Sequence, residues 1–173
     1  MPRVVGALFA LLSVVIPADA GAVHATAARP SSLATYHGRV IDLAISWEGA
    51  RACSIAESGN ACFDSDAEMN AALTAALSDR GTSILSSCAT TLNLYGAAGF
   101  GAPHLALNTP ELTWISLSTY SFSGITSSYI VGGCSSAFRD ASNTNYPGNT
   151  SAGASASSMV SGWDNRITKV YIT

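Results

Sequence analysis

The sequence predicts an all-β protein with one helical segment, and three observations lead to this prediction. Only 11% of its 173 residues are charged while 48% are hydrophobic, which is too apolar for a disordered chain. From Thr90 onward, short apolar runs alternate with Gly, Pro, Asn and Ser, as in short strands joined by turns. The chain also has four cysteines, an even number that is typical of a disulfide framework.

The N-terminal residues 1–27 are predicted to be a secretory signal peptide that is not part of the fold. Arg3 gives a basic start, residues 4–16 form an apolar run, and small-residue cleavage signals end at Ala20 and at Ala27. The apolar run is shorter than the roughly 20 residues that cross a bilayer. We therefore expect cleavage after Ala20 or Ala27, and a secreted, extracellular chain with no membrane anchor.

The charge balance bears on the partners that the chain can bind. Removal of residues 1–27 takes away one basic and one acidic residue, so the net charge stays at −3. A chain with this charge lacks the basic surface that holds phosphate backbones, and nucleic acid is not an expected partner. We expect a monomer.

The cysteines Cys53, Cys62, Cys88 and Cys134 all follow the signal peptide. Cys53 and Cys62 flank a turn-like Glu-Ser-Gly-Asn segment, which predicts that they face each other across a β-hairpin. Cys88 and Cys134 would then form the second disulfide, although four cysteines allow three pairings. Zinc ligation is the alternative, but the close Cys or His spacing that it needs is absent from the sequence.

Residues 28–87 are predicted to form a small hairpin-plus-helix region. The segment GRVIDLAISW, residues 38–47, has the composition of a strand. A helix is expected at 66–78, because Ser65 and Glu68 form a capping box and an apolar stripe follows before Gly81. The stripe consists of Met69, Ala72, Leu73, Ala76 and Leu77. Residues 88–173 are expected to form a second region that folds on its own.

That second region contains a weak internal repeat of about 40 residues. The first copy begins at Leu92–Ala102 and ends at Leu117–Val131, and the second begins at Ala137–Gly148 and ends at Ser161–Ile172. Each copy opens with an aromatic residue, a turn-rich loop, a second aromatic residue and a glycine. Each closes with a polar loop that leads into an apolar strand.

The paired segments Tyr95…Phe100-Gly101 and Phe138…Tyr146-Pro147-Gly148 resemble the two Greek-key motifs of a βγ-crystallin domain. The resemblance covers residues 88–173 and includes secreted bacterial proteins of this fold, among them small metalloprotease inhibitors. It implies a two-Greek-key sandwich and a non-enzymatic role. An extracellular protease is the partner implied by the inhibitor alternative.

In this family, each polar loop resembles half of a Ca²⁺ site. Its second residue offers a side-chain oxygen, its third a backbone carbonyl and its fifth a hydroxyl. Ca²⁺ takes 6 to 8 hard oxygen ligands, so two loops have to cooperate with water. The second loop, residues 164–169, reads Asp-Asn-Arg-Ile-Thr-Lys and keeps this pattern through its fifth position. The first loop, residues 123–128, reads Ser-Gly-Ile-Thr-Ser-Ser and has lost both acid or amide positions.

The resemblance implies two crossed sites of unequal quality, each formed by residues of both loops. One combines Asn165 with the carbonyl of Ile125 and the hydroxyl of Ser127. The other combines the carbonyl of Arg166 and the hydroxyl of Thr168 with Gly124, which has no side chain to donate. The candidate metal residues are therefore Ile125, Ser127, Asp164, Asn165, Arg166 and Thr168. We expect at most one weak calcium site, with Lys169 opposing the cation.

Other interpretations of these residues stand beside this one. An Asp-Asn pair before a strand is most often a turn whose side chains bond their own backbone. The aromatic residues are expected to pack in the core rather than form a sugar-binding platform. An enzyme is not expected, since only His24, His37 and His104 could serve a catalytic triad and no nucleophile elbow is present. A protease inhibitor could use the exposed loop of residues 142–153 or the segment that contains Pro103 and Pro110.

Overall fold

The structure is a computed structural model that describes residues 31–79, 92–108 and 112–173. The predicted signal peptide and Cys88 lie outside the described residues. Within these ranges the chain is mostly β, with one α-helix and one 3₁₀ turn, which confirms the predicted all-β class. None of the helices in the described ranges is long and apolar enough to cross a membrane.

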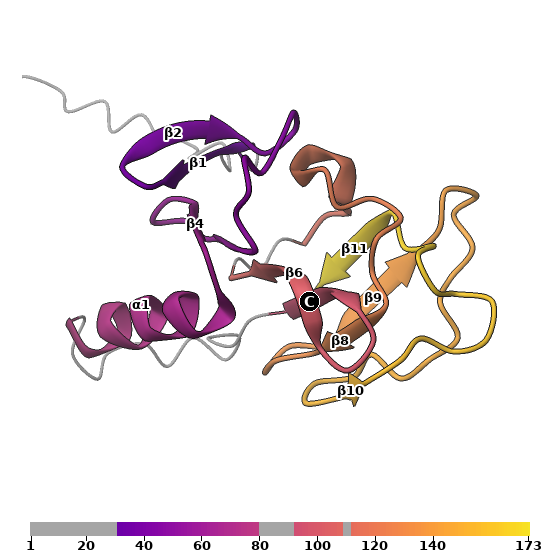
Figure 1. Cartoon of the computed structure of the whole chain (residues 1–173). Helices are drawn as coiled ribbons and strands as arrows, with labels where there is room; N and C mark the ends of the chain where they lie inside the picture. The colour runs from indigo at the N-terminus through magenta and orange to yellow at the C-terminus, as the bar shows by residue number, and fades with distance from the viewer. Residues whose placement is uncertain (1–30, 80–91, 109–111) are drawn as a thin grey trace, which may run out of the picture.

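The elements follow one another along the chain in the order seen in Figure 1. In the first half they are β1 (Leu33–Tyr36), β2 (Arg39–Asp42), β3 (Ala52–Ile55), β4 (Ala61–Phe63) and α1 (Asp66–Asp79). In the second half they are β5 (Leu92–Ala97), β6 (Gly101–Leu107), β7 (Ile115–Ser116), the 3₁₀ turn η1 (Leu117–Tyr120), β8 (Ser128–Ile130), β9 (Ser136–Arg139), β10 (Ser155–Ala156) and β11 (Lys169–Ile172).

The cysteine hairpin is formed as predicted. Strands β3 and β4 are antiparallel with Cys53 directly opposite Cys62, and the two sulfurs are bonded. Cys134 is also disulfide-bonded. Its predicted partner Cys88 lies outside the described residues, so that pairing stays a prediction.

The predicted strand at 38–47 is shorter in the structure, because β2 ends at Asp42. The carboxylate of Asp42 accepts a hydrogen bond from the Ala44 backbone N–H at 3.0 Å, and its carbonyl accepts one from Ile45 at 3.0 Å. An Asp that bonds the backbone two residues ahead makes a turn. The apolar pattern of the segment therefore continues past the strand into a turn.

The predicted helix is present as α1, and Ser65 caps it. The Ser65 hydroxyl accepts a hydrogen bond from the Glu68 N–H at 3.3 Å, and the Glu68 carboxylate reaches back to the Asp64 N–H at 3.1 Å. Only part of the predicted apolar stripe is buried. Met69 is fully buried against Ala52 and Ala106 with Leu73 beside it, whereas Ala72 and Ala76 are exposed.

The strands form two sheets, and each sequence repeat contributes one strand to the sheet that is formed mainly by the other repeat. The larger sheet has the order β10-β8-β5-β6-β3-β4-β1-β2, and the smaller has the order β7-β11-β9. The first repeat supplies β5, β6 and β8 to the larger sheet but β7 to the smaller one. The second repeat supplies β9 and β11 to the smaller sheet but β10 to the larger one. Each repeat therefore completes the sheet of the other.

Aromatic residues pack the core where the two sheets meet. Tyr129 of β8 and Phe138 of β9 are both fully buried, and their rings meet edge to face at 5.0 Å. Tyr146 contacts Tyr129 at 5.8 Å and Trp163 at 5.4 Å, again edge to face. Such geometry is favoured by the ring quadrupoles and adds to the burial of apolar area. Most of the aromatic residues are thus core residues, as the sequence predicts, but Phe100 and Trp114 are only partly buried.

The N-terminal region joins the same sheet and the same core. Strand β3 pairs in parallel with β6, opposite Leu105 and its neighbours. The Trp47 indole N–H donates to the Tyr120 carbonyl at 2.7 Å, and its ring stacks on Phe122 at 5.7 Å. Figure 1 shows β6 between the N-terminal elements and strands β8–β11. The predicted boundary at residue 87 lies outside the described residues.

Candidate functional site

The two polar loops, far apart in the sequence, lie against each other through a reciprocal pair of backbone hydrogen bonds. The Gly124 N–H donates to the Ile167 carbonyl at 2.8 Å, and the Asn165 N–H donates to the Thr126 carbonyl at 3.0 Å. In each case the second residue of one loop bonds the fourth residue of the other. The backbone hydrogen bonds between the two loops thus have approximate twofold symmetry.

The approximate twofold symmetry extends to the backbone conformation of the two loops. Gly124 has φ of 70° and Asn165 has φ of 55°, so both second positions are left-handed. Glycine adopts this conformation freely, and Asn is among the few other residues that tolerate it. Behind the loops, the Ser127 N–H donates to the Tyr95 carbonyl and the Thr168 N–H donates to the Arg139 carbonyl, both at 2.8 Å. Gly at position 124 and Asn at position 165 are therefore explained by the left-handed backbone that both loops adopt there.

One pair of side-chain oxygens meets across the loops. The Ser127 hydroxyl donates to the Asn165 side-chain oxygen at 3.2 Å. Ser127 is buried, with 6% of its surface exposed, whereas Asn165 is exposed. A hydroxyl can turn its hydrogen away and present a lone pair, so both oxygens can face a cation at the solvent edge. The predicted Ile125 carbonyl belongs to the same loop, two residues before Ser127.

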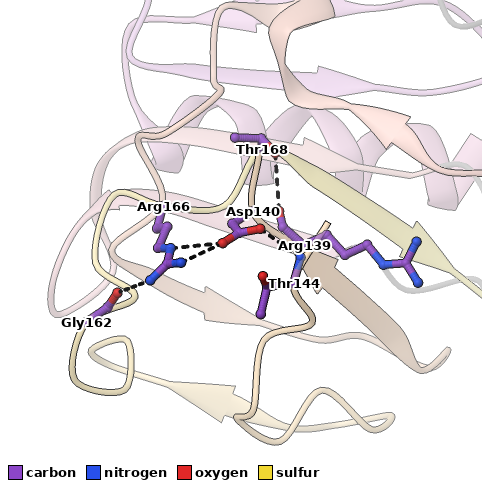
Figure 2. Close-up of polar contacts among 6 residues, drawn as sticks. All are labelled: Arg139, Asp140, Thr144, Gly162, Arg166 and Thr168. Atoms are coloured by element: carbon purple, nitrogen blue, oxygen red, sulfur yellow. Dashed lines mark hydrogen bonds and ion pairs between the residues drawn. The ribbon is translucent and has the colours of Figure 1, made fainter. Parts of the chain in front are cut away.

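The second predicted site, which contains Thr168 and Gly124, has a different set of side-chain contacts. The Thr168 hydroxyl donates to the Arg139 carbonyl at 3.4 Å, which is a long contact for a hydroxyl (Figure 2). Gly124 offers only backbone atoms here. The structure therefore brings together the side chains of Ser127 and Asn165, and it does not give Thr168 a side-chain partner from the first loop.

The two cationic residues of the second loop are held by partners outside it. Arg166 donates to the Asp140 carboxylate from Nε at 3.0 Å and from a terminal nitrogen at 2.7 Å, as Figure 2 shows. The Lys169 ammonium donates to the Asn143 side-chain oxygen at 2.9 Å. The Asp164 carboxylate is exposed and accepts a long contact of 3.4 Å from the Asn165 amide. Of these three, only Asp164 places a negative charge beside the Ser127–Asn165 pair.

Asp140 is a residue of this region that the sequence analysis missed. It is buried, and its second carboxylate oxygen accepts the Thr144 N–H at 2.8 Å. Burial alone would raise the pKa of Asp140, but the Thr144 N–H and the Arg166 guanidinium outweigh burial and hold this pKa below its usual range. The sequence does carry one signal, because Asp140 and Asn143 are both residue types that favour turns. In the structure, Asn143 has a left-handed φ of 61° and closes this turn.

The donor set is made of neutral oxygens and one exposed carboxylate. Among the described residues, no group of three or more His, Cys, Asp or Glu side chains could hold a metal ion. A cation at the loop pair would depend on hydroxyl, amide and carbonyl oxygens together with water. These are the hard donors that Ca²⁺ accepts, and Zn²⁺ would prefer nitrogen or sulfur.

The side chains of the two described histidines bond to residues outside the loop pair. His104 is buried in β6, and its ring nitrogens lie 2.9 Å from Asp66 and 2.8 Å from Asn93. His37 is exposed, with Nε2 at 2.9 Å from the Asp64 carboxylate. Burial lowers the pKa of His104, although the Asp66 carboxylate opposes this shift.

Searches of protein-family models, of curated proteins and of solved structures each found no match to this chain.

Proposed function

We propose that this chain is a secreted, non-enzymatic protein of βγ-crystallin type that binds Ca²⁺ weakly between its two polar loops. Two features of the structure support the fold part of the proposal. The repeats exchange strands β7 and β10 between the two sheets, and their loops exchange backbone hydrogen bonds at equivalent positions. Both features are expected of two Greek-key motifs that pack as a pair.

A single observation carries the calcium part of the proposal. The Ser127 and Asn165 side-chain oxygens come from different loops and meet at 3.2 Å. A bound Ca²⁺ would supply the positive charge that draws these oxygens and the Ile125 carbonyl to one point, and water would complete its shell. The loop pair is already fixed by backbone bonds, so little chain entropy has to be lost on binding.

The charge around the loop pair sets a low affinity. Asp164 is the one acidic residue of the two loops, and the nearby Asp140 carboxylate is already paired with Arg166. Sites with few carboxylates bind Ca²⁺ with dissociation constants of roughly 10⁻⁴ to 10⁻³ M, a range found in extracellular modules. Secretion, which agrees with the predicted signal peptide and with the disulfides, would expose the chain to calcium in that range.

Thermal unfolding of two matched variants tests the proposal. Wild type should melt at a higher temperature in millimolar Ca²⁺, because a ligand that binds only the folded state stabilises it. Asn165→Ala removes a proposed ligand and should abolish this shift. Thr168→Ala removes a hydroxyl from the second predicted site and should leave the shift nearly intact. Without calcium, Thr168→Ala should lose about 0.5–1.5 kcal/mol of stability, as expected for one hydrogen bond. Asn165→Ala should lose about 1–2 kcal/mol more, because Ala is strained at the left-handed φ of this position.

The outcome distinguishes the proposal from its alternatives. Absence of a shift in wild type would leave Asp164 and Asn165 as turn residues only. Equal loss in both variants would show that the crossed assignment of ligands is wrong. Mg²⁺ serves as the control ion, because it demands a tighter octahedral shell than these loops offer.

A protease inhibitor remains the second candidate, and one observation favours it. The loop of residues 142–153 has mostly exposed side chains, yet its backbone is anchored where the Tyr129 hydroxyl donates to the Asn149 carbonyl at 2.7 Å. An inhibitor needs such an exposed and fixed segment. The other predicted segment is less suited, since Pro103 lies within β6; Pro110 lies outside the described residues. A panel of secreted metallo- and serine proteases tests this candidate.

A further inference from the structure

The outer face of the smaller sheet gathers side chains that the calcium proposal does not use. Along β11, Val170 and Ile172 are buried while Lys169 and Tyr171 alternate with them, so the latter two lie on the outer face. Lys169 is directly opposite Arg139 of β9 on one side and Ser116 of β7 on the other. All these residues therefore share one face.

Two aromatic rings complete this face. The Trp114 and Tyr171 rings lie 5.6 Å apart, and both residues are partly exposed. The Arg139 guanidinium lies 4.1 Å from the centre of the Trp114 ring, which is a cation–π contact. We call Trp114, Arg139, Lys169 and Tyr171 the Trp114 face.

The two cations of this face are placed against the usual rule for sheets. Like charges directly opposite on neighbouring strands destabilise a sheet. Arg139 and Lys169 nevertheless form such a pair, and within the described residues neither has a carboxylate partner. Arg39 and Arg166, by contrast, each pair with an acid. A bound anion would offset the repulsion.

Neutral groups hold both cations in place without neutralising them. The Arg139 Nε donates to the Asn145 side-chain oxygen at 2.8 Å, and Lys169 donates to Asn143 at 2.9 Å. The terminal nitrogens of Arg139 make no hydrogen bond to any other described residue. In Figure 2 the Arg139 side chain points away from Asp140. The fork that binds carboxylate or sulfate groups in a bidentate way is thus available.

We propose that the Trp114 face binds an acidic sugar chain, one that carries carboxylate or sulfate groups. A pyranose ring presents C–H groups, which pack against the negative face of an aromatic ring. The Arg139 and Lys169 charges would bind the acidic groups, and the Asn143 and Asn145 amides would bond hydroxyls. The combination of flat aromatic area, amides and two cations fits a sugar chain better than a peptide. An oligonucleotide is the other polyanion that stacks on aromatic rings, and the test below distinguishes it from a sugar chain.

Affinity electrophoresis of the full mature chain in gels that contain oligogalacturonate tests this proposal. EDTA is present throughout, so that the result is independent of calcium binding at the loops. Wild type should be retarded by oligogalacturonate but not by its methyl-esterified form, which keeps the sugar ring and loses the charge. Polyglutamate and an oligothymidine strand serve as the peptide and nucleic-acid probes, and neither should retard the chain.

Charge-neutral variants locate the site. Arg139→Gln and Lys169→Gln should each weaken binding about tenfold, as expected for loss of one charge-assisted contact. Arg51→Gln makes the same change in net charge elsewhere, at an exposed arginine without a carboxylate partner among the described residues, and should bind like wild type. Near-UV circular dichroism shows whether each variant is folded. The proposal is overturned if wild type ignores oligogalacturonate, if polyglutamate or oligothymidine binds equally well, or if Arg51→Gln weakens binding as much.

Discussion

Arg166 contributes two different groups to the second loop. The resemblance assigns its carbonyl to a metal half-site, whereas the structure shows its guanidinium bound to the buried carboxylate of Asp140. This contact ties residues 164–169 to the turn that follows β9. Asn165 and Ser127 could be predicted from the local loop motif, but Asp140 could not be predicted as the partner of Arg166, because their contact depends on how β9 and β11 pair.

Acid titration tests the role of Asp140. Because its pKa is lowered in the folded chain, the stabilisation from ionised Asp140 is complete above the pKa of an unfolded Asp, about 3.9, and is lost as the pH falls below it. Asp140→Asn should lower the melting temperature near neutral pH and should flatten its fall in acid. Thermal unfolding of both chains over an acidic pH series measures this.

Asp164→Asn is the matched control, since it removes one carboxylate that is exposed. It should follow the wild-type acid profile closely. Identical profiles for Asp140→Asn and wild type would contradict a stabilising role for the Asp140–Arg166 pair.

At the scale of elements, helix α1 shows which features local sequence can predict. The capping box and the length of the helix are local, and both were predicted. Its docking is not local: Met69 packs on Ala52 of β3 and Ala106 of β6, and Asp66 bonds His104. The sequence stripe suggested a wider apolar contact, but Ala72 and Ala76 remain exposed because only one edge of the helix meets the sheet.

The contact between α1 and His104 should depend on pH. Burial lowers the pKa of His104 against the opposing effect of Asp66, and the ring also faces Asn93 and stacks on Tyr95 at 4.1 Å. The stabilisation is therefore complete above the pKa of an unfolded His, about 6.5, and is lost as the pH falls below it. Amide hydrogen exchange in α1, corrected for the intrinsic rate, should accelerate as the pH falls from about 7 to 5.

His104→Gln keeps a polar side chain that does not titrate, and it should remove this pH dependence. Exchange in the distant strand β11 serves as the internal reference, because it should change little over the same range. Equal pH dependence in wild type and His104→Gln would show that another group controls α1.

At the scale of the whole molecule, one sheet crosses the two sequence regions. The repeats and the cysteine hairpin could be predicted from periodicity and turn residues. The parallel pairing of β3 with β6 could not, because parallel pairing carries no local turn signal. Residues of both regions also share one buried core, including Leu43 and Leu105.

A chain that begins at residue 88 tests how far the two regions depend on each other. The sequence predicts that this part folds alone, but the structure leads us to expect that it does not. Removal of β3 would expose the edge of β6 to aggregation, and removal of Trp47 would uncover Phe122. Size-exclusion chromatography and thermal unfolding should show aggregation or loss of a cooperative transition.

The full-length variant Trp47→Phe is the milder control. It loses the bond to the Tyr120 carbonyl and should cost about 1 kcal/mol while keeping a cooperative transition. A soluble, monomeric and cooperatively unfolding chain from residue 88 would show that the N-terminal region is an appendage.

The central claim is that the two polar loops together bind calcium, and backbone amide NMR during a Ca²⁺ titration tests it most directly. The account predicts shifts that saturate in the millimolar range and are largest in residues 123–128 and 164–169, around Ser127 and Asn165. Both loops should respond with one common dissociation constant, because the Asn165 and Ser127 oxygens would share one ion. An absence of saturable shifts, or shifts confined to one loop, would contradict the account.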